Sequence, residues 1–178
     1  MDLFDQLKGE IQETNLLIVR AVDDLNDEQV AWQPGGTAPS IGFHLWHSAR
    51  WADSDREAIT GQSQIWRKDG YAERWGLASA SLLGEADTGT GLSDDQSAAI
   101  ILPGKHELVS YVEASLAGLE TMLDRLPPEQ LVSLTAPADG QQTSVQGLLF
   151  TILTHINRHL GMIEALKGLQ GLKGTATR

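Results

Sequence analysis

Apolar residues recur every three to four positions along four stretches of the chain, a spacing that predicts four amphipathic helices. The stripe of the first stretch consists of Leu3, Phe4, Leu7, Ile11, Ile18, Val22 and Leu25. That of the second includes Ile41, His44, Leu45, Trp51 and Ile59. The third and fourth stripes consist of Leu108, Val112, Leu116, Leu119, Leu123 and Leu126, and of Val145, Leu148, Leu149, Ile152, Ile156 and Ile163. No stretch of useful length alternates as a strand does, so the pattern predicts an all-α fold, a four-helix bundle.

Residues that favour helix ends lie on either side of the second and third stripes. The proline- and glycine-containing stretch at 33–39 cannot continue a helix and is expected to be a loop. Ser40 can then cap the second helix, and Gly61 can stop it. The third helix is expected to start near Gly104 and to end at the pair of prolines that begins with Pro127.

The fourth helix has its own start signal. After a second loop at 136–140, Thr143 and Gln146 fit a capping box. The glycine-rich tail after about residue 168 is expected to fray. The chain has 178 residues, an ordinary size for one domain, so we expect residues 1–178 to form a single domain.

The connection between the second and third helices, residues 61–104, is long for a compact domain. It contains several aromatic residues and then a glycine-rich run at 87–91. We expect a short helical turn near 71–75 and a weak helical segment at 93–101. Because long connections are often functional, we expect this one to pack across the bundle as a lid that shapes a pocket.

The composition narrows the classes of function. The chain has no cysteine, which excludes disulfides, thiolate zinc sites and cysteine nucleophiles, and fits a reducing compartment. Its formal charge is −11, from 24 acidic and 13 basic residues, so it repels phosphates overall and we expect no nucleic-acid partner. The acidic N-terminus and the lack of a run of roughly 20 apolar residues predict no secretion signal and no membrane association. We therefore expect a soluble, cytoplasmic protein.

Histidines carry the chemical information. His155 and His159 stand at positions i and i+4 of the predicted fourth helix, so both imidazoles project from one face. Two neutral ring nitrogens can meet one cation there at about 2.0–2.1 Å. The same spacing also occurs in histidine pairs that bind no metal. Ile156 stands where zinc proteases of the His-Glu-x-x-His type have their general base, so that reaction class loses its main support.

The predicted second helix offers a further ligand. His44 and His47, at positions i and i+3, lie on the same face, and only one of them need bind the ion. The alternative for such a histidine is a place at the edge of the core, with a hydrogen bond to backbone or to a carboxylate. His106, near the start of the third helix, is expected to be exposed.

Two segments resemble the DinB-like superfamily of four-helix-bundle metalloproteins. One is Trp32-Gln33-Pro34-Gly35-Gly36 followed by residues 40–53, similar to the family's Trp/Pro/Gly loop and a helix whose histidine precedes an arginine-tryptophan element. The other is residues 155–161, similar to the C-terminal His-x-x-x-His-x-Gly signature. The resemblance spans nearly the whole chain. It implies a bundle of the up-down-down-up type with a long connection between helices two and three.

The resemblance also implies which residues bind the metal. The family's three ligands fall on His47, His155 and His159, and His44 would be a neighbour that lines the pocket or orients a ligand. After His-x-Gly the family usually has Gln or Glu, whereas this chain has Met162. A polar group in the pocket or behind a ligand is therefore not expected at this position.

The implied activity is that of a divalent-metal-dependent enzyme, a thiol-dependent S-transferase or a related hydrolase. Three neutral histidines leave open positions on an ion, where water or a thiol can be deprotonated. We expect zinc or nickel, a small-molecule substrate, and a low-molecular-weight thiol such as bacillithiol, mycothiol or glutathione as co-substrate. The alternative is a non-catalytic protein in which the ion is structural or a ligand is sensed, and Met162 gives this reading some support.

Further polar residues are candidates for contacting the substrate or supporting the ligands. They are Arg50, Asp53 and Asp55 on the second helix and Tyr111 on the third. The alternative for the charged residues is a solvated face with local ion pairs. The alternative for Tyr111 is an ordinary place in the core.

Apolar residues outside the main stripes indicate an interface. They are Leu16, Leu17 and Val19 on the first helix and Leu148 and Leu160 on the fourth. An exposed apolar patch above a few hundred Å² usually marks a contact surface, and a two-fold pair is the commonest closed assembly, so we expect a homodimer. The alternative is that the 61–104 connection covers these residues within one chain.

Overall fold

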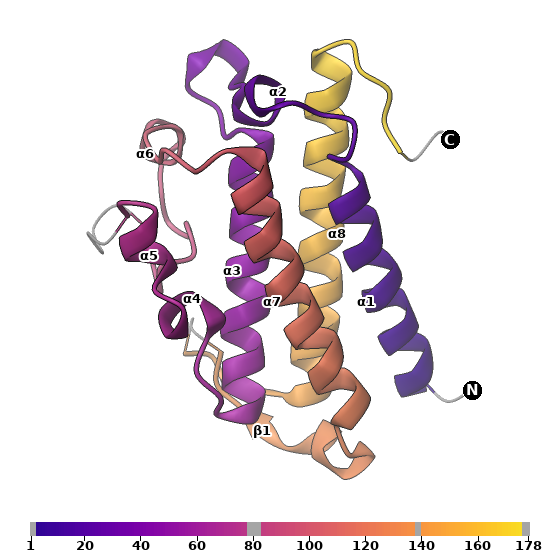
Figure 1. Ribbon diagram of the computed structural model, residues 1–178. Helices are drawn as coiled ribbons and strands as arrows, with labels where there is room; N and C mark the ends of the chain where they lie inside the picture. The colour runs from indigo at the N-terminus through magenta and orange to yellow at the C-terminus, as the bar shows by residue number, and fades with distance from the viewer. Residues whose placement is uncertain (1–2, 78–82, 138–139, 176–178) are drawn as a thin grey trace.

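Four long helices build the computed structural model, which describes residues 3–77, 83–137 and 140–175. They are α1 (Leu3–Arg20), α3 (Ile41–Thr60), α7 (Lys105–Arg125) and α8 (Val145–Leu169). In Figure 1, α1 and α8 run upward and α3 and α7 run downward, which is the up-down-down-up arrangement. α3 packs against α7 and α8, and α1 packs against the same two helices from the other side. The predicted all-α four-helix bundle is confirmed.

Short elements occupy the connections. Before α3 lie α2 (Asp27–Ala31) and the 3-10 helix η1 (Pro34–Gly36). Between α3 and α7 lie α4 (Ile65–Lys68), α5 (Tyr71–Arg74) and α6 (Asp94–Ala98). Before α8 lie the 3-10 helix η3 (Pro128–Val132) and two strands, β1 (Leu134–Thr135) and β2 (Thr143–Ser144), which pair antiparallel. The helical segments predicted near 71–75 and at 93–101 are confirmed as α5 and α6.

The predicted helix ends are correct for α3 and wrong by one residue for α8. Ser40 Oγ accepts a hydrogen bond from Phe43 N at 3.1 Å, and Gly61 ends α3 in the left-handed conformation with φ of 70°. At α8 the N-cap is Ser144, whose side chain accepts from the backbone N–H of Gly147, and the expected cap Thr143 pairs with β1 instead. This pairing keeps the backbone extended for one more residue, which moves the cap.

The core follows the predicted stripes, with one exception at the N-terminus. Ile11 and Ile18 of α1 are fully buried, whereas Leu3 is 56% exposed and lies outside the core. The first stripe is also not a single helix. α1 ends at Arg20, and the last two residues of the stripe are buried in the turn that follows it.

The connection between α3 and α7 packs through its aromatic residues. Trp66, Tyr71 and Trp75 surround the ring of Tyr111 on α7, with centroids 5.3, 4.7 and 5.6 Å from it. Figure 1 shows α4 and α5 beside α3 and α7, on the side away from α1. These two helices of the connection therefore lie away from the apolar residues of α1, which the alternative to a dimer needed the connection to cover.

Of those apolar residues, Leu16 is 48% exposed and Leu148 is buried in the core. The other three are half-buried, and two of them, Val19 and Leu160, pack against the core. The homodimer stays a prediction, with a smaller apolar surface than the sequence indicated. No helix in the described part of the chain is long and apolar enough to cross a membrane.

Side-chain hydrogen bonds hold the C-terminal end of α8. The Lys167 ammonium is fully buried and donates to the Ala21 carbonyl at 2.6 Å and to Asp24 at 2.9 Å. Beyond the helix, the side-chain amide of Gln170 donates to the backbone of Gln29 at 3.1 Å. These hydrogen bonds join the end of α8 to the turn after α1 and to α2. The fraying of the tail after residue 168 stays a prediction.

Candidate metal centre

Three histidines from two helices bring their ring nitrogens together. Nε2 of His47, on α3, lies 3.1 Å from Nε2 of His155, on α8. Nε2 of His155 lies 3.1 Å from Nε2 of His159, one turn further along α8. The ligand atoms of the three residues all lie within 4.8 Å of one another. The structure therefore gathers the three histidines that the sequence analysis selected.

These separations fit one divalent ion. Nitrogens that each lie about 2.0–2.1 Å from a tetrahedral ion are about 3.3 Å apart, close to the 3.1 Å between the neighbouring Nε2 atoms here. A proton on Nε2 of His155 could satisfy only one of its two contacts well, whereas an ion accepts a lone pair from every nitrogen. The donor set, three imidazoles, is that of catalytic zinc sites and leaves a further position open.

His47 is held in the orientation that metal binding needs. Its Nδ1 contacts the backbone carbonyl of Thr88, which can only accept, so Nδ1 carries the ring proton and Nε2 presents a lone pair. The ring also stacks on Phe43, with centroids 5.8 Å apart and planes 13° apart. Both contacts limit the rotation of the ring.

His44 acts on a ligand rather than on the pocket. Its Nδ1 lies 3.0 Å from Nδ1 of His159. If His159 offers Nε2 to an ion, its Nδ1 carries the proton and donates to Nδ1 of His44, which then carries its own proton on Nε2. Of the two roles expected for His44, the geometry matches the orienting one.

A pocket of about 680 Å³ opens beside the three histidines. Its apolar walls are the side chains of Trp51, Pro137, Leu148 and Met162. Its polar lining consists of Asp55, Thr90, Gln141, Gln142, Thr143, Thr151 and Arg158. This volume lies within the range of pockets that enclose small molecules. The connection contributes Thr90 to the lining, while the segment before α8 contributes more residues, so the predicted lid is only part of the wall.

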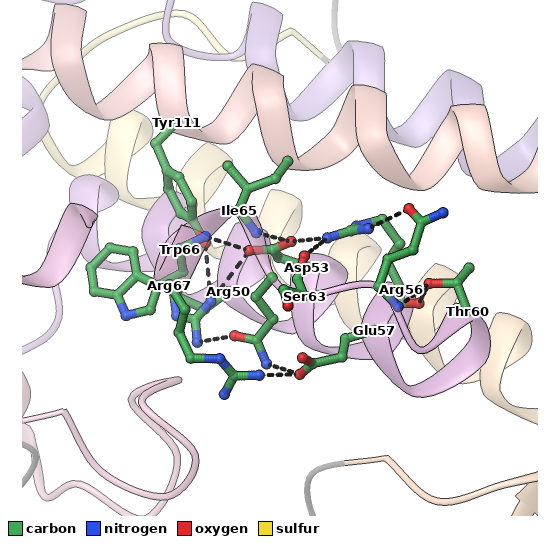
Figure 2. Close-up of polar contacts among 12 residues, drawn as sticks. Arg50, Asp53, Arg56, Glu57, Thr60, Ser63, Ile65, Trp66, Arg67 and Tyr111 are labelled. Atoms are coloured by element: carbon green, nitrogen blue, oxygen red, sulfur yellow. Dashed lines mark hydrogen bonds and ion pairs between the residues drawn. The ribbon is translucent and has the colours of Figure 1, made fainter. Parts of the chain in front are cut away.

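Three candidates from the sequence lie elsewhere. Arg50, Asp53 and Tyr111 do not line the pocket but form a buried polar network, together with Gln64 (Figure 2). Arg50 is 1% and Asp53 0% exposed, so the solvated charged face considered for them is wrong. Burial raises the pKa of Tyr111 to about 12, which keeps its hydroxyl neutral beside Arg50. The remaining candidate, Asp55, is also buried but does line the pocket.

The sequence analysis missed several residues of the site. Arg158 lies three positions after His155 on α8, and this helical spacing could have identified it. The glutamines and Thr143 of the segment before α8 carry no pattern that links them to the histidines. Thr88 contributes a backbone carbonyl, which any residue type supplies.

Burial lowers the pKa of every histidine in the cluster in the metal-free protein. The pKa falls to about 4 for His44, to about 3 for His155 and to about 2 for His159. Burial is the largest cause in each, and neighbouring positive charge, including Arg158 beside the two α8 residues, adds to it. Burial also lowers the pKa of His47, although a backbone hydrogen bond opposes it. Near neutral pH the four imidazoles are therefore uncharged, and each has one ring nitrogen with a lone pair.

We expect the metal-free protein to lose stability as the pH falls from about 7 to about 5. The unfolded chain takes up protons on these histidines below their ordinary pKa of about 6.5, whereas the folded chain does not, so the unfolded state gains by roughly 1–2 kcal/mol for one histidine. Urea unfolding at several pH values measures this slope. His159→Gln should reduce the slope and His106→Gln, at an exposed position, should not. A free energy of unfolding that is flat over this range would contradict the expectation.

Comparison with known proteins agrees with this architecture. The family model described as the DinB superfamily matches residues 10–163. No curated protein matches the chain. A solved structure, described as the conserved protein of locus from Enterococcus faecalis, is similar to this chain with a TM-score of 0.77 and 17% identity, over 94% of this chain and 96% of that one. At this identity the likeness shows a shared fold.

Proposed function

We propose that this chain, which belongs to the DinB superfamily, is a divalent-metal-dependent enzyme acting on a small molecule bound beside the three histidines. One observation carries the proposal. The convergent histidines His47, His155 and His159 line a pocket of about 680 Å³, so a small molecule bound in this pocket could reach an ion that they hold. Closed structural sites offer no such access.

The reaction that fits best is S-transfer from a small thiol, or a related hydrolysis. When bound, zinc or nickel would supply the nucleophile, by favouring the deprotonated form of a thiol or of water at neutral pH. In an S-transfer, the sulfur forms a bond to an electrophilic carbon of the substrate. The bond from that carbon to its leaving group breaks, the leaving group takes the electron pair, and the thiol proton passes to solvent.

The pocket residues would bind and orient the two reactants. Arg158 places a cation beside two of the ligands and would hold a negative group such as a carboxylate. Trp51 and Leu148 form an apolar wall that would exclude water from the carbon skeleton. We also propose that the protein acts in the cytoplasm, where its lack of cysteine fits the reducing conditions.

Met162 supports a second candidate, a non-catalytic protein that senses a ligand. The residue lines the pocket and is 39% exposed, so its thioether stands in the wall at the position where the resemblance to the family would lead one to expect Gln or Glu. A binding site needs no group there that moves a proton, whereas a hydrolase has more use for one. The two candidates differ in turnover and agree on metal and ligand binding.

Cobalt-loaded protein titrated with glutathione, cysteine and a thiol without a carboxylate tests both candidates. Thiolate bound to cobalt gives a charge-transfer band in the near ultraviolet. We expect this band at lower concentrations of the two thiols that carry a carboxylate than of the thiol that lacks one. A chlorinated aromatic electrophile is then added, and conjugation faster than with free cobalt supports the enzyme. A band without turnover favours the sensor. Failure to retain cobalt, or binding without any effect of thiols, overturns the thiol-dependent proposal.

A further inference from the structure

We propose that Arg50 is a positioning residue for the ligand His47 and acts through the backbone of residues 86–89. The inference rests on the proposed metal binding at His47, His155 and His159. Arg50 itself touches neither the pocket nor any of the three histidines.

Arg50 is tied to the loop by its guanidinium group. Nε donates to the Asp87 carbonyl at 2.8 Å, and Nη2 lies 3.4 Å from the Ala86 carbonyl. The same group donates to Gln64 Oε1 at 2.7 Å and to the Tyr111 hydroxyl at 3.2 Å. Figure 2 shows the guanidinium group between Tyr111 on α7 and Asp53 on α3, with dashed lines to both. A buried arginine with so many fixed acceptors has one orientation available.

The loop needs this support because its backbone is strained. Ala86 and Asp87 are consecutive and both adopt left-handed conformations, with φ of 51° and 56°. Such residues cost free energy and persist only where their surroundings fix them. Arg50 binds the carbonyls of these two residues. A pairing between Glu85 and Thr90 closes the turn.

The strained turn delivers the next carbonyl, that of Thr88, to Nδ1 of His47. Gly89 shows how closely the loop approaches. A Cβ at this position would lie 2.9 Å from Phe43 and from Trp46 and 3.2 Å from Nδ1 of His47. Its φ of 88° also favours glycine. The position of the Thr88 carbonyl is therefore set by the close contact of Gly89 with Phe43 and Trp46 and by the hydrogen bonds of Arg50 to the two preceding carbonyls.

The consequence is a fixed tautomer at the ligand. Free imidazole carries its proton on either nitrogen, and the carbonyl selects Nδ1–H, so Nε2 keeps the lone pair that binds an ion. If the loop relaxes, His47 can rotate or take the other tautomer, and one of the three ligands is lost for part of the time. The competing explanation is that Arg50 serves only as a buried charge partner of Asp53, 3.6 Å away.

Arg50→Lys separates these explanations, with Arg56→Lys as its matched control. Lysine keeps a positive charge near Asp53 but cannot hold two carbonyls and Gln64 at once. Arg56 is on the same helix, is also buried and pairs with Asp53 at 3.1 Å, but its other bonds go to residues 60, 62 and 63. We expect Arg50→Lys to lower zinc affinity about ten- to a hundred-fold, the usual effect of losing a partner of a ligand. Arg56→Lys should change it less than twofold.

A readout without metal makes the test independent of the proposed function. Nitrogen-15 shifts of the His47 ring should show a single Nδ1–H tautomer in the parent and in Arg56→Lys, and a mixture in Arg50→Lys. Gly89→Ala, whose added Cβ would push the loop away from Phe43 and Trp46, should also give a mixture and covers the case in which Arg50→Lys does not fold. A single tautomer retained in both variants overturns the inference, whether or not the protein binds zinc.

A double-mutant cycle for zinc affinity closes the test. In a His47→Ala background, Arg50→Lys should cause no further loss, because the ligand through which Arg50 acts is gone. An equal loss in both backgrounds would show a general effect of Arg50 on the fold and overturn the positioning role. If the parent itself binds no zinc, the proposed function fails, and the tautomer measurement still decides the inference.

Discussion

Replacing His159 with alanine is expected to lower the affinity for zinc or nickel by roughly a hundred- to a thousand-fold. Four-ligand zinc sites bind with about 10–16 kcal/mol, or roughly 3–4 kcal/mol per protein ligand. The substitution removes one of the three convergent nitrogens and also the partner of His44, whose Nδ1 lies 3.0 Å from that of His159. The effect exceeds that expected for any residue behind the ligands, because the ion loses a direct bond.

Competition with a chromophoric chelator measures this affinity. His106→Ala is the control, since it removes an exposed histidine from α7 and leaves the cluster intact. Urea unfolding of the metal-free variants shows whether a lower metal affinity results merely from loss of the folded structure. Unchanged metal binding by His159→Ala, with the protein still folded, would mean that the ion is held by other residues and that the three-histidine site is wrong.

Asp53→Asn is expected to destabilise the protein by about 3–5 kcal/mol, the cost of removing one partner from a buried ion pair. The carboxylate is 0% exposed and accepts hydrogen bonds from the backbone N–H groups of Ile65 and Trp66, at 3.0 and 2.9 Å. It also pairs with the buried guanidinium groups of Arg50 and Arg56. Asparagine leaves two buried cations without an anion and turns an N–H donor towards other donors.

Asp124→Asn is the comparison for this second experiment. Asp124 pairs with Lys8 but its side chain is 57% exposed, so its loss should cost at most about 1 kcal/mol. Urea midpoints with unchanged slopes give both free energies of unfolding. A cost for Asp53→Asn as small as that for Asp124→Asn would show that the α3 network adds little to the stability of the folded state.

The helices could be predicted from the sequence because each buries one stripe. The start of α3 could also be predicted from the sequence, since Ser40 is a good N-cap residue and directly precedes the apolar stripe. The start of α8 was not, because Thr143 and Ser144 are both good caps. The choice between them depends on the pairing of Thr143 with Thr135, a contact that local sequence does not encode.

The buried charges of α3 could not be predicted for a similar reason. Helical periodicity tells which face of α3 meets the bundle, and by that rule Arg50, Asp53 and Asp55 could face solvent. The α3–α7 connection packs on this face and provides Gln64 and the carbonyls of residues 86 and 87 as partners. A polar residue covered by a long connection looks the same in the sequence as one left in water.

The candidate site was easier to predict than its support. The spacing of His155 and His159 indicates that they share a helix face. The chain has only five histidines, so few candidates remained for the third ligand. The Thr88 carbonyl that orients His47 belongs to the backbone, so no residue type marks it. In the sequence only the surrounding glycines indicate a turn, and they do not indicate what it contacts.

The distance along the chain between the ligands bears on when an ion can bind. His47 and His155 are 108 positions apart, so a single ion can contact both only after α3 and α8 have come together. Closing so long a loop is a late and slow event, and contacts made after the transition state slow unfolding without speeding folding. Metal would therefore prolong the lifetime of the folded chain rather than help to form it. A chain synthesised under metal starvation should reach its native state at the usual rate and then be degraded sooner.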